Sequence, residues 1–269
     1  MRRTVLAVAL SVLCLTAGCS FGGAGTATET GSPTPTPGLS AAETPPGVSD
    51  GRLADEAALL SAHTDRLAAT GAVWDVETNA TVYRAGASSR VERKQRTFVE
   101  PGSREYVYQL ANPRSRFTAW GNRSLQVIRG QVGERERFRI ADAADNRSLV
   151  GARLLAPQLN EGELAVASIN RSADPTRVTL RTTTPPEEAR AFPRNATNVT
   201  GYTAVLVVDA TGRIHSFEAS ATYDVRAGGE TVVEGASYEI SYRLVDRDAP
   251  RVQRPGWVNR TLVNASTAG

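Results

Sequence analysis

The sequence predicts an α+β fold that is mostly antiparallel β, in which about ten strands curl around an N-terminal helix and one or two short helices on the concave face of the sheet. Three observations predict this class. An apolar stripe at helical spacing lies near residue 60, a long alternation of polar and apolar residues runs from 213 to 245, and shorter alternating segments occupy most of the chain between them.

The first helix is expected over residues 53–69, because apolar residues recur there at helical spacing. Ser49 or Asp50 is suited to cap its start, and Gly71 to end it. A short helix is expected over 146–156, and a single helical turn over 185–192. The apolar stripe of the first helix consists of Leu53, Ala57, Leu60 and Leu67.

Residues 213–245 predict two long strands joined at the Gly-Gly turn of RAGGE, 226–230. One face of this hairpin is apolar, and the other, which includes Val233, is polar. Shorter strands are expected at 72–79, 81–86, 88–100, 104–110, 115–120, 124–129, 135–140, 163–169, 176–182 and 202–209. The apolar face consists of His215, Phe217, Ala219, Ala221, Tyr223 and Val225, followed by Ala236, Tyr238, Ile240, Tyr242 and Leu244.

The N-terminus has the features of an export signal. Arg2 and Arg3 precede an apolar run over residues 5–17, which is shorter than the roughly 20 residues of a membrane-spanning helix. Cys19 follows this run directly, and its residue type alone leaves four roles open: a nucleophile, half of a disulfide, a metal ligand, or a residue at a cleavage site.

The stretch Thr16-Ala17-Gly18-Cys19 resembles a lipobox, and the paired arginines resemble a twin-arginine export signal. The lipobox resemblance implies that Cys19 becomes the lipidated first residue of the mature protein, rather than an incidental cysteine beside an ordinary signal peptide. Cys14 would then leave with the leader, and no free thiol would remain for disulfides, zinc fingers or cysteine catalysis.

Four segments are expected: a lipoprotein signal peptide over 1–19, a disordered Thr/Pro/Gly-rich stalk over 20–49, a β domain over 50–258, and a flexible tail over 259–269. Twenty of the 29 residues from 20 to 48 are Gly, Pro, Ser or Thr. Without Arg2 and Arg3 the chain has 29 basic and 28 acidic residues, so its charge predicts no nucleic-acid partner.

Eight of the ten asparagines lie in N-x-S/T sequons, an excess that predicts a glycosylated surface in an exported protein. Turn chemistry would also bring Asn and Ser or Thr together, although not at this strict spacing. The eight sites are Asn79, Asn122, Asn146, Asn170, Asn195, Asn198, Asn259 and Asn264.

The helix followed by a long antiparallel meander is similar to the LolA and LppX/LprG lipoproteins, a resemblance that implies a half-barrel sheet around a lipid-sized cavity. The lipobox, the stalk, PPGVSDG, the Ala62-His63 pair, LVVDATGRI and RPGW also resemble uncharacterised haloarchaeal surface lipoproteins over most of residues 45–258. The lipobox resemblance implies lipid attachment at the extracellular face of the cell membrane.

The sequence contains no recognisable catalytic motif, and each of its two histidines, His63 and His215, is expected to be structural. No enzyme activity, cofactor or metal is therefore expected, although a surface hydrolase would need one of these histidines beside a serine and a carboxylate. As a set, five aromatic residues would suit a pocket with apolar walls and hydroxyl groups, although core packing is the commoner role for any one of them. The LolA resemblance implies that they line a lipid site. They are Trp74, Phe217, Tyr223, Tyr238 and Tyr242.

Two functions follow from these expectations. The first is a membrane-anchored extracellular lipoprotein that binds or carries a lipid or another apolar ligand without catalysis, with the membrane as its partner through the lipid anchor. The alternative is a ligand-free structural or protein-interaction module of the cell envelope, in which large side chains fill the space between helix and sheet. The sequence identifies no particular protein partner.

Overall fold

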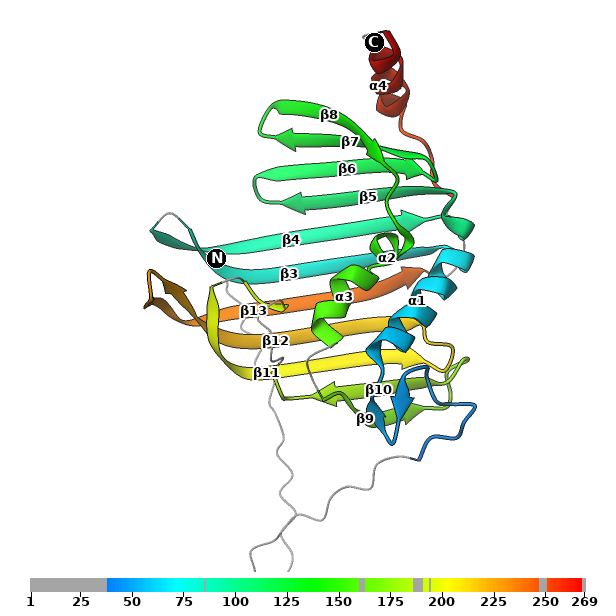
Figure 1. Ribbon diagram of the computed structural model, residues 1–269, viewed down its shortest axis with the longest axis vertical. Coiled ribbons are helices and arrows are strands. Elements are labelled where there is room, and N and C mark those ends of the chain that lie inside the picture. Colours follow the sequence, from blue (N-terminus) through cyan, green and yellow to red (C-terminus); the bar gives the residue numbers. More distant parts are fainter. Residues whose placement is uncertain are drawn as a thin grey trace, which may run out of the picture. The chain divides into compact units, whose positions relative to one another are not determined.

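The computed structural model describes residues 38–84, 86–159, 163–185, 191–193, 195–246 and 251–267. The signal peptide, Cys19, most of the stalk and most of the expected helical turn at 185–192 lie outside these residues. The described strands form one antiparallel, unclosed sheet in the order β1-β2-β9-β10-β11-β12-β13-β3-β4-β5-β6-β7-β8 (Figure 1). The predicted fold class is confirmed: a mostly antiparallel, curved sheet carries a few helices on its face.

Eleven of the thirteen strands match the expected segments, with β3 continuous where two strands were expected and β11 starting six residues earlier than expected. Strands β1 and β2 were not predicted: Val48 and Ser49, at the end of the expected disordered stalk, pair with Leu53 and Arg52, and Val48 is buried in the core. Their bounds are β1 Val48–Ser49, β2 Arg52–Leu53, β3 Ala72–Arg84, β4 Ala87–Val99, β5 Glu105–Asn112, β6 Ser115–Asn122, β7 Leu125–Val132, β8 Arg135–Asp142, β9 Ala165–Asn170, β10 Arg177–Thr182, β11 Ala196–Asp209, β12 Ile214–Ala227 and β13 Glu230–Asp246. The helices are α1 Glu56–Thr70, α2 Asn146–Leu149, α3 Ala152–Leu159 and α4 Gly256–Thr267, with a 3-10 turn over Pro101–Ser103.

Helix α1 starts three residues later than its apolar stripe predicts. Asp55 is the N-cap, and its carboxylate accepts a hydrogen bond from the Ala58 N–H at 2.8 Å. Leu53 is instead extended in β2, where its N–H donates to the Leu164 carbonyl at 2.9 Å. Gly71 ends the helix as predicted, with a positive φ of 75°.

The hairpin of β12 and β13 is confirmed, and it places Phe217 opposite Tyr242 on the buried face. The register of the hairpin shifts at two points, on either side of Val225, and the first shift breaks the predicted alternation. Gly235 has φ 63° and its N–H donates to the Asp224 carboxylate at 3.1 Å, which produces a bulge where the register shifts. Because of this bulge Val233 packs against the core instead of lying on the polar face as predicted.

Helices α1, α2 and α3 cover one face of the sheet over β9 to β13 and β3, and Leu149 of α2 extends this cover to Val99 of β4 and Tyr106 of β5. The same face of β6 to β8 is left uncovered (Figure 1). The single short helix expected over 146–156 is two helices, because Gly151 between them has φ 80°. The main core lies between these helices and the sheet, with Leu59, Leu67 and Leu155 packed on the strands.

The C-terminal residues form a helix rather than the expected flexible tail. Helix α4 and the segment before it pack on the opposite face of β5 to β8, where Val258 and Trp257 cover Trp120 and Val127. The guanidinium of Arg254 lies 4.5 Å from the Trp120 ring centroid. Apolar residues at helical spacing, Trp257, Val258 and Leu262, bury this helix against the sheet.

Candidate ligand site

The five aromatic residues predicted to bind a ligand are all buried, and they lie in the packed core beneath the helices. Trp74 and Tyr242 contact each other, with ring centroids 5.6 Å apart. The hydroxyl of Tyr238 accepts a hydrogen bond from Gln158 at 3.0 Å, and the hydroxyl of Tyr223 donates to the Thr81 carbonyl. These contacts pack the five residues against their neighbours, and Trp74 also lines a cavity.

His63 and Trp74 fix the junction between α2 and α3 to the rest of the fold. The indole N–H of Trp74 donates to the Leu149 carbonyl at 2.7 Å. His63 Nε2 donates to the Val150 carbonyl at 3.1 Å, and His63 Nδ1 accepts from the Ile214 N–H at 3.1 Å. Burial lowers the pKa of His63 to about 4, so the imidazole is neutral near pH 7 and can serve as donor and acceptor at once.

A cavity of about 490 Å³ lies beside this junction, between α2–α3 and the inner face of the sheet, by which we mean the face that carries these helices. Its size falls within the range of ligand pockets, about 300–1,000 Å³. The walls combine aromatic and aliphatic side chains with a few polar ones. They are Trp74, Arg93, Gln95, Thr97, Tyr106, Tyr108, Gln126, Ala144, Ser148, Leu149, Gly151, Arg153 and Leu154.

The polar groups of this cavity suit a ligand with a polar or anionic end. Thr97 lies in the cavity wall, and its hydroxyl is fully buried and finds no hydrogen-bond partner among the described residues. Arg93 is exposed and forms no ion pair with a described residue, while Arg153 pairs with Asp145 at 3.0 Å. No aspartate or glutamate lines the cavity, so its electrostatic potential favours an anion.

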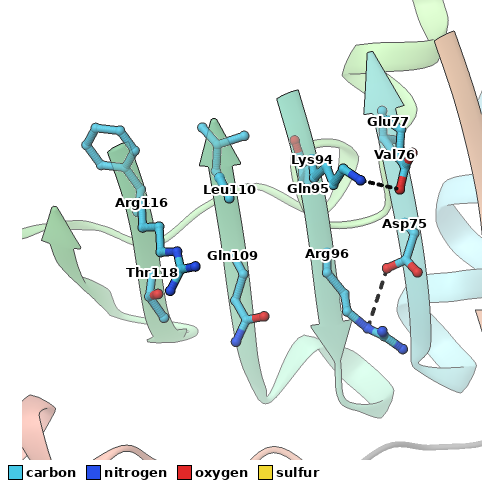
Figure 2. A pocket seen from close by; sticks show the side chains of 12 residues that line it. Asp75, Val76, Glu77, Lys94, Gln95, Arg96, Gln109, Leu110, Arg116 and Thr118 are labelled. Atoms are coloured by element: carbon cyan, nitrogen blue, oxygen red, sulfur yellow. Dashed lines mark ion pairs between the residues drawn. The ribbon is translucent and has the colours of Figure 1, made fainter. Parts of the chain in front are cut away.

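A second hollow of about 480 Å³ lies on the outer face, opposite the helices (Figure 2). Four of its five charged side chains pair with one another: Lys94 lies 3.5 Å from Glu77, and Arg96 lies 3.4 Å from Asp75, while Arg116 forms no ion pair with a described residue. Burial raises the pKa of Asp75, although the Arg96 guanidinium opposes this shift. All four side chains are substantially exposed, as in an ordinary solvated sheet face, so the inner cavity is the better ligand site.

His215 is paired with Asp209 at the turn between β11 and β12. His215 Nε2 lies 2.9 Å from Asp209 Oδ2, while Oδ1 accepts from the Thr211 hydroxyl at 2.6 Å and from two backbone N–H groups. Burial would raise the pKa of Asp209, but these hydrogen bonds hold it at about 2. The hydroxyl binds the carboxylate rather than the imidazole, so the group lacks the nucleophile–base contact of a hydrolase.

Six of the predicted glycosylation sites present exposed side chains: Asn146, Asn170, Asn195, Asn198, Asn259 and Asn264. Asn79 and Asn122 are only half exposed. Asn122 Oδ1 accepts from the N–H groups of Ser124 and Leu125 in a turn, and Asn198 Nδ2 donates to Asp224. A glycan at Asn198 would remove one of the two protons through which Nδ2 makes such bonds.

Sequence reasoning missed most of the cavity residues, although the chain contained a signal for them. In β4 the residues that share a face with buried Val99 include Arg93, Gln95 and Thr97, which interrupt the apolar alternation with polar side chains. Polar groups at inward positions of a strand indicate either a buried network or a site. The opposite wall of the cavity is formed by residues of α2 and α3, which are far from β4 in the chain, so the pattern of β4 alone does not indicate them.

These features define an open, helix-covered antiparallel sheet with one amphiphilic cavity. No family model matches the chain, and no curated protein matches it. Among solved structures it is similar to a LolA-superfamily protein from Nitrosomonas europaea, with 11% identity over 72% of this chain and 93% of that one and a TM-score of 0.27.

It is also similar to a putative outer-membrane lipoprotein-sorting protein domain from Vibrio parahaemolyticus, with 9% identity over 76% and 97% of the two chains and a TM-score of 0.26. A β-barrel-like protein with a domain of unknown function from Brucella abortus matches with 8% identity over 68% and 100% and a TM-score of 0.23. In the part of the chain that the structure describes, no helix is both long and apolar enough to cross a bilayer.

Proposed function

We propose that this chain is a membrane-anchored extracellular lipoprotein that binds or carries a lipid or another apolar ligand without catalysis. The cavity between α2–α3 and the inner face of the sheet is the observation that supports it most directly. Its aromatic and aliphatic walls suit an apolar chain, and the unpartnered Thr97 hydroxyl and the Arg93 guanidinium suit a polar or anionic end.

The N-terminal sequence and the sequons support the location. A lipidated Cys19 would hold the protein at the outer face of the membrane, and a diacyl- or diether-glyceryl group would supply the two chains that firm anchoring needs. Exposed sequons on α2, α4 and the strand ends are accessible to a glycosylation system outside the cell. No step of this proposal uses a catalytic residue, a cofactor or a metal.

Native mass spectrometry of the membrane-extracted protein tests the proposal. The wild-type chain should retain a co-purifying lipid or apolar molecule. Gln126→Trp places a large ring in the cavity and should abolish retention, whereas Gln109→Trp makes the same change on the outer face and should leave it intact. Neither glutamine makes a hydrogen bond through its side chain to a described residue. A wild-type protein free of ligand, or equal retention by both variants, would contradict the proposal.

The alternative, a ligand-free module of the cell envelope, is supported by a different observation. The space beneath α1 and α3 is filled by large buried side chains, among them Trp74, Phe217 and Tyr242. If this alternative holds, both tryptophan variants should behave like the wild type and no ligand should be found.

A further inference from the structure

Strand β8 forms one free edge of the sheet and carries a row of unpaired arginines. Arg135, Arg137 and Arg139 are all exposed and lie on the inner face, about 7 Å apart at the spacing of alternate strand residues. Their cross-strand neighbours on β7 are Val132, Gly130 and Ile128, so no acidic side chain lies opposite them. None of the three forms an ion pair or hydrogen bond through its side chain with a described residue.

Strands β6 to β8 carry an excess of positive charge. Residues 115–142 contain six arginines and three acidic residues, a difference of three positive charges. One of the acids, Glu136, is bound by Arg129 on the outer face. The described part of β6 to β8 is thus a local cationic surface, although the mature chain as a whole is close to neutral.

Exposed apolar side chains surround the same edge on both faces. Four of the eight large hydrophobic residues that are exposed in the described chain lie on β6 to β8. Val132 and Phe117 are 58% and 36% exposed on the inner face, and Phe138 and Ile140 are 45% and 39% exposed on the outer face. A protein partner that docks on one face would leave the apolar pair on the other face in water. A lipid layer into which the whole edge inserts would cover both pairs.

We propose that the β6–β8 edge is a docking surface for an anionic membrane. The arginine row contacts anionic headgroups, and the apolar side chains on either face enter the interfacial layer beside it. The surface is continuous with the ligand cavity, because Ala141 of β8 pairs with Gln126, which lines that cavity. Docking at this edge brings the cavity next to the bilayer, which is where an apolar ligand would enter or leave.

The chain contains a natural reporter for this contact. Of its three tryptophans, Trp74 and Trp120 are 0% and 1% exposed, so changes in quenching report on Trp257. Trp257 is partly exposed and lies against Phe138 of β8, with ring centroids 6.0 Å apart. Its environment therefore changes when the edge docks, independently of the N-terminal anchor.

The experiment adds detergent-purified full-length protein to vesicles of phosphatidylcholine alone or with about 30% phosphatidylglycerol. Acrylamide should quench Trp257 less, and brominated lipid should quench it more, on the anionic vesicles only. Salt at about 0.5 M should abolish the difference. Neutral vesicles should hold the protein through its anchor and leave Trp257 unchanged.

Two triple variants distinguish an effect of the arginine row from an effect of the total net charge. Each arginine near an anionic surface strengthens binding about fivefold. A variant in which Arg135, Arg137 and Arg139 are all replaced by glutamine should therefore bind anionic vesicles about 100-fold more weakly. The control variant replaces Arg181, Arg226 and Arg243 with glutamine as well. These three arginines are exposed on other strands, so the control should dock like the wild type.

Three results would overturn the proposal. The first is an identical Trp257 signal on neutral and anionic vesicles. The second is an equal loss of docking in the control variant, which would assign the effect to total charge. The third is the same protection of Trp257 by soluble polyglutamate without vesicles, which would assign the edge to an acidic polymer instead of a membrane.

Discussion

Lowering the pH should weaken the contact that His63 makes at the centre of the fold. The folded-state pKa of His63 is about 4, against an ordinary value of 6.5, because burial penalises the imidazolium. Protonation would also remove the acceptor that Nδ1 offers to the Ile214 N–H. Between these two pH values the unfolded chain binds a proton that the folded chain does not, so folding stability falls as the pH falls.

The size of the effect follows from the two pKa values. The gap of 6.5 minus 4 corresponds to about 3 kcal/mol at 1.36 kcal/mol per unit. The contribution of His63 is fully present above pH 6.5 and is lost progressively down to pH 4, so about 2 kcal/mol should be gone at pH 5.

Urea unfolding of the wild type and His63→Leu near pH 7, 6 and 5 checks this expectation. Near pH 7 the variant should be less stable, because the Val150 carbonyl and the Ile214 N–H each lose a partner at about 1–3 kcal/mol. That deficit should shrink by about 2 kcal/mol at pH 5, since only the wild type loses the contribution of a neutral histidine. All other titrating groups occur in both proteins and cancel in the difference.

Tyr242→Phe is the control, because it removes a hydroxyl 3.4 Å from Nε2 and keeps the imidazole. It should show the same pH dependence as the wild type. A deficit of His63→Leu that stays constant from pH 7 to 5 would refute the reasoning, as would an NMR titration that gives His63 its ordinary pKa.

Two further predictions concern the turn beside α1 and the anchor. Gly212→Ala should destabilise the fold by more than Gly228→Ala. Both glycines have positive φ, at a cost of about 1–2 kcal/mol for alanine. Only at Gly212 would the new Cβ also lie 2.6 Å from Ala62 Cβ. Urea unfolding measures the difference, and equal losses would contradict the contact with α1. Cys19→Ser should release the protein into the medium, as measured by fractionation and immunoblotting; a variant that stays membrane-bound would contradict the lipid anchor.

Periodicity was enough to predict the sheet from β3 to β13, because these strands alternate and most of their turns have glycine, asparagine or aspartate where the chain reverses. It missed β1 and β2, whose two residues each are too short to show a period. It failed where one residue changes the local conformation. Gly235 introduces a bulge that turns Val233 inward, and Gly151 divides the helix expected over 146–156. Glycine inside a periodic segment is a recognisable warning, but the pattern does not indicate which face the following residues will take.

The site was harder to predict for a different reason. The aromatic residues on the hairpin are apolar enough to line a pocket, but they become core because α1 and α3 lie on them. The position of those helices depends on contacts between residues far apart in the chain, such as Trp74 with Leu149 and His63 with Ile214. The spacing of residues along the chain does not indicate where the helices pack. The sequence could therefore indicate the kind of side chains that line a pocket, but not the location of the pocket in the fold.

The inner face of the sheet from the edge of α2 to β8 connects the two proposals. Apolar side chains remain in water there at a cost of about 25 cal/mol per Å² of exposed apolar surface, unless something covers them. On the outer face α4 covers Trp120 and Val127 and leaves Phe138 and Ile140 exposed, whereas on the inner face of β6 to β8 no described helix provides cover. A ligand would cover the part beside α2, and a membrane the part beside β8. The two coverings use different residues. Gln126→Phe, which fills the cavity without adding a second accessible indole, should therefore abolish ligand retention and leave the docking signal of Trp257 intact, while the triple arginine variant should do the reverse.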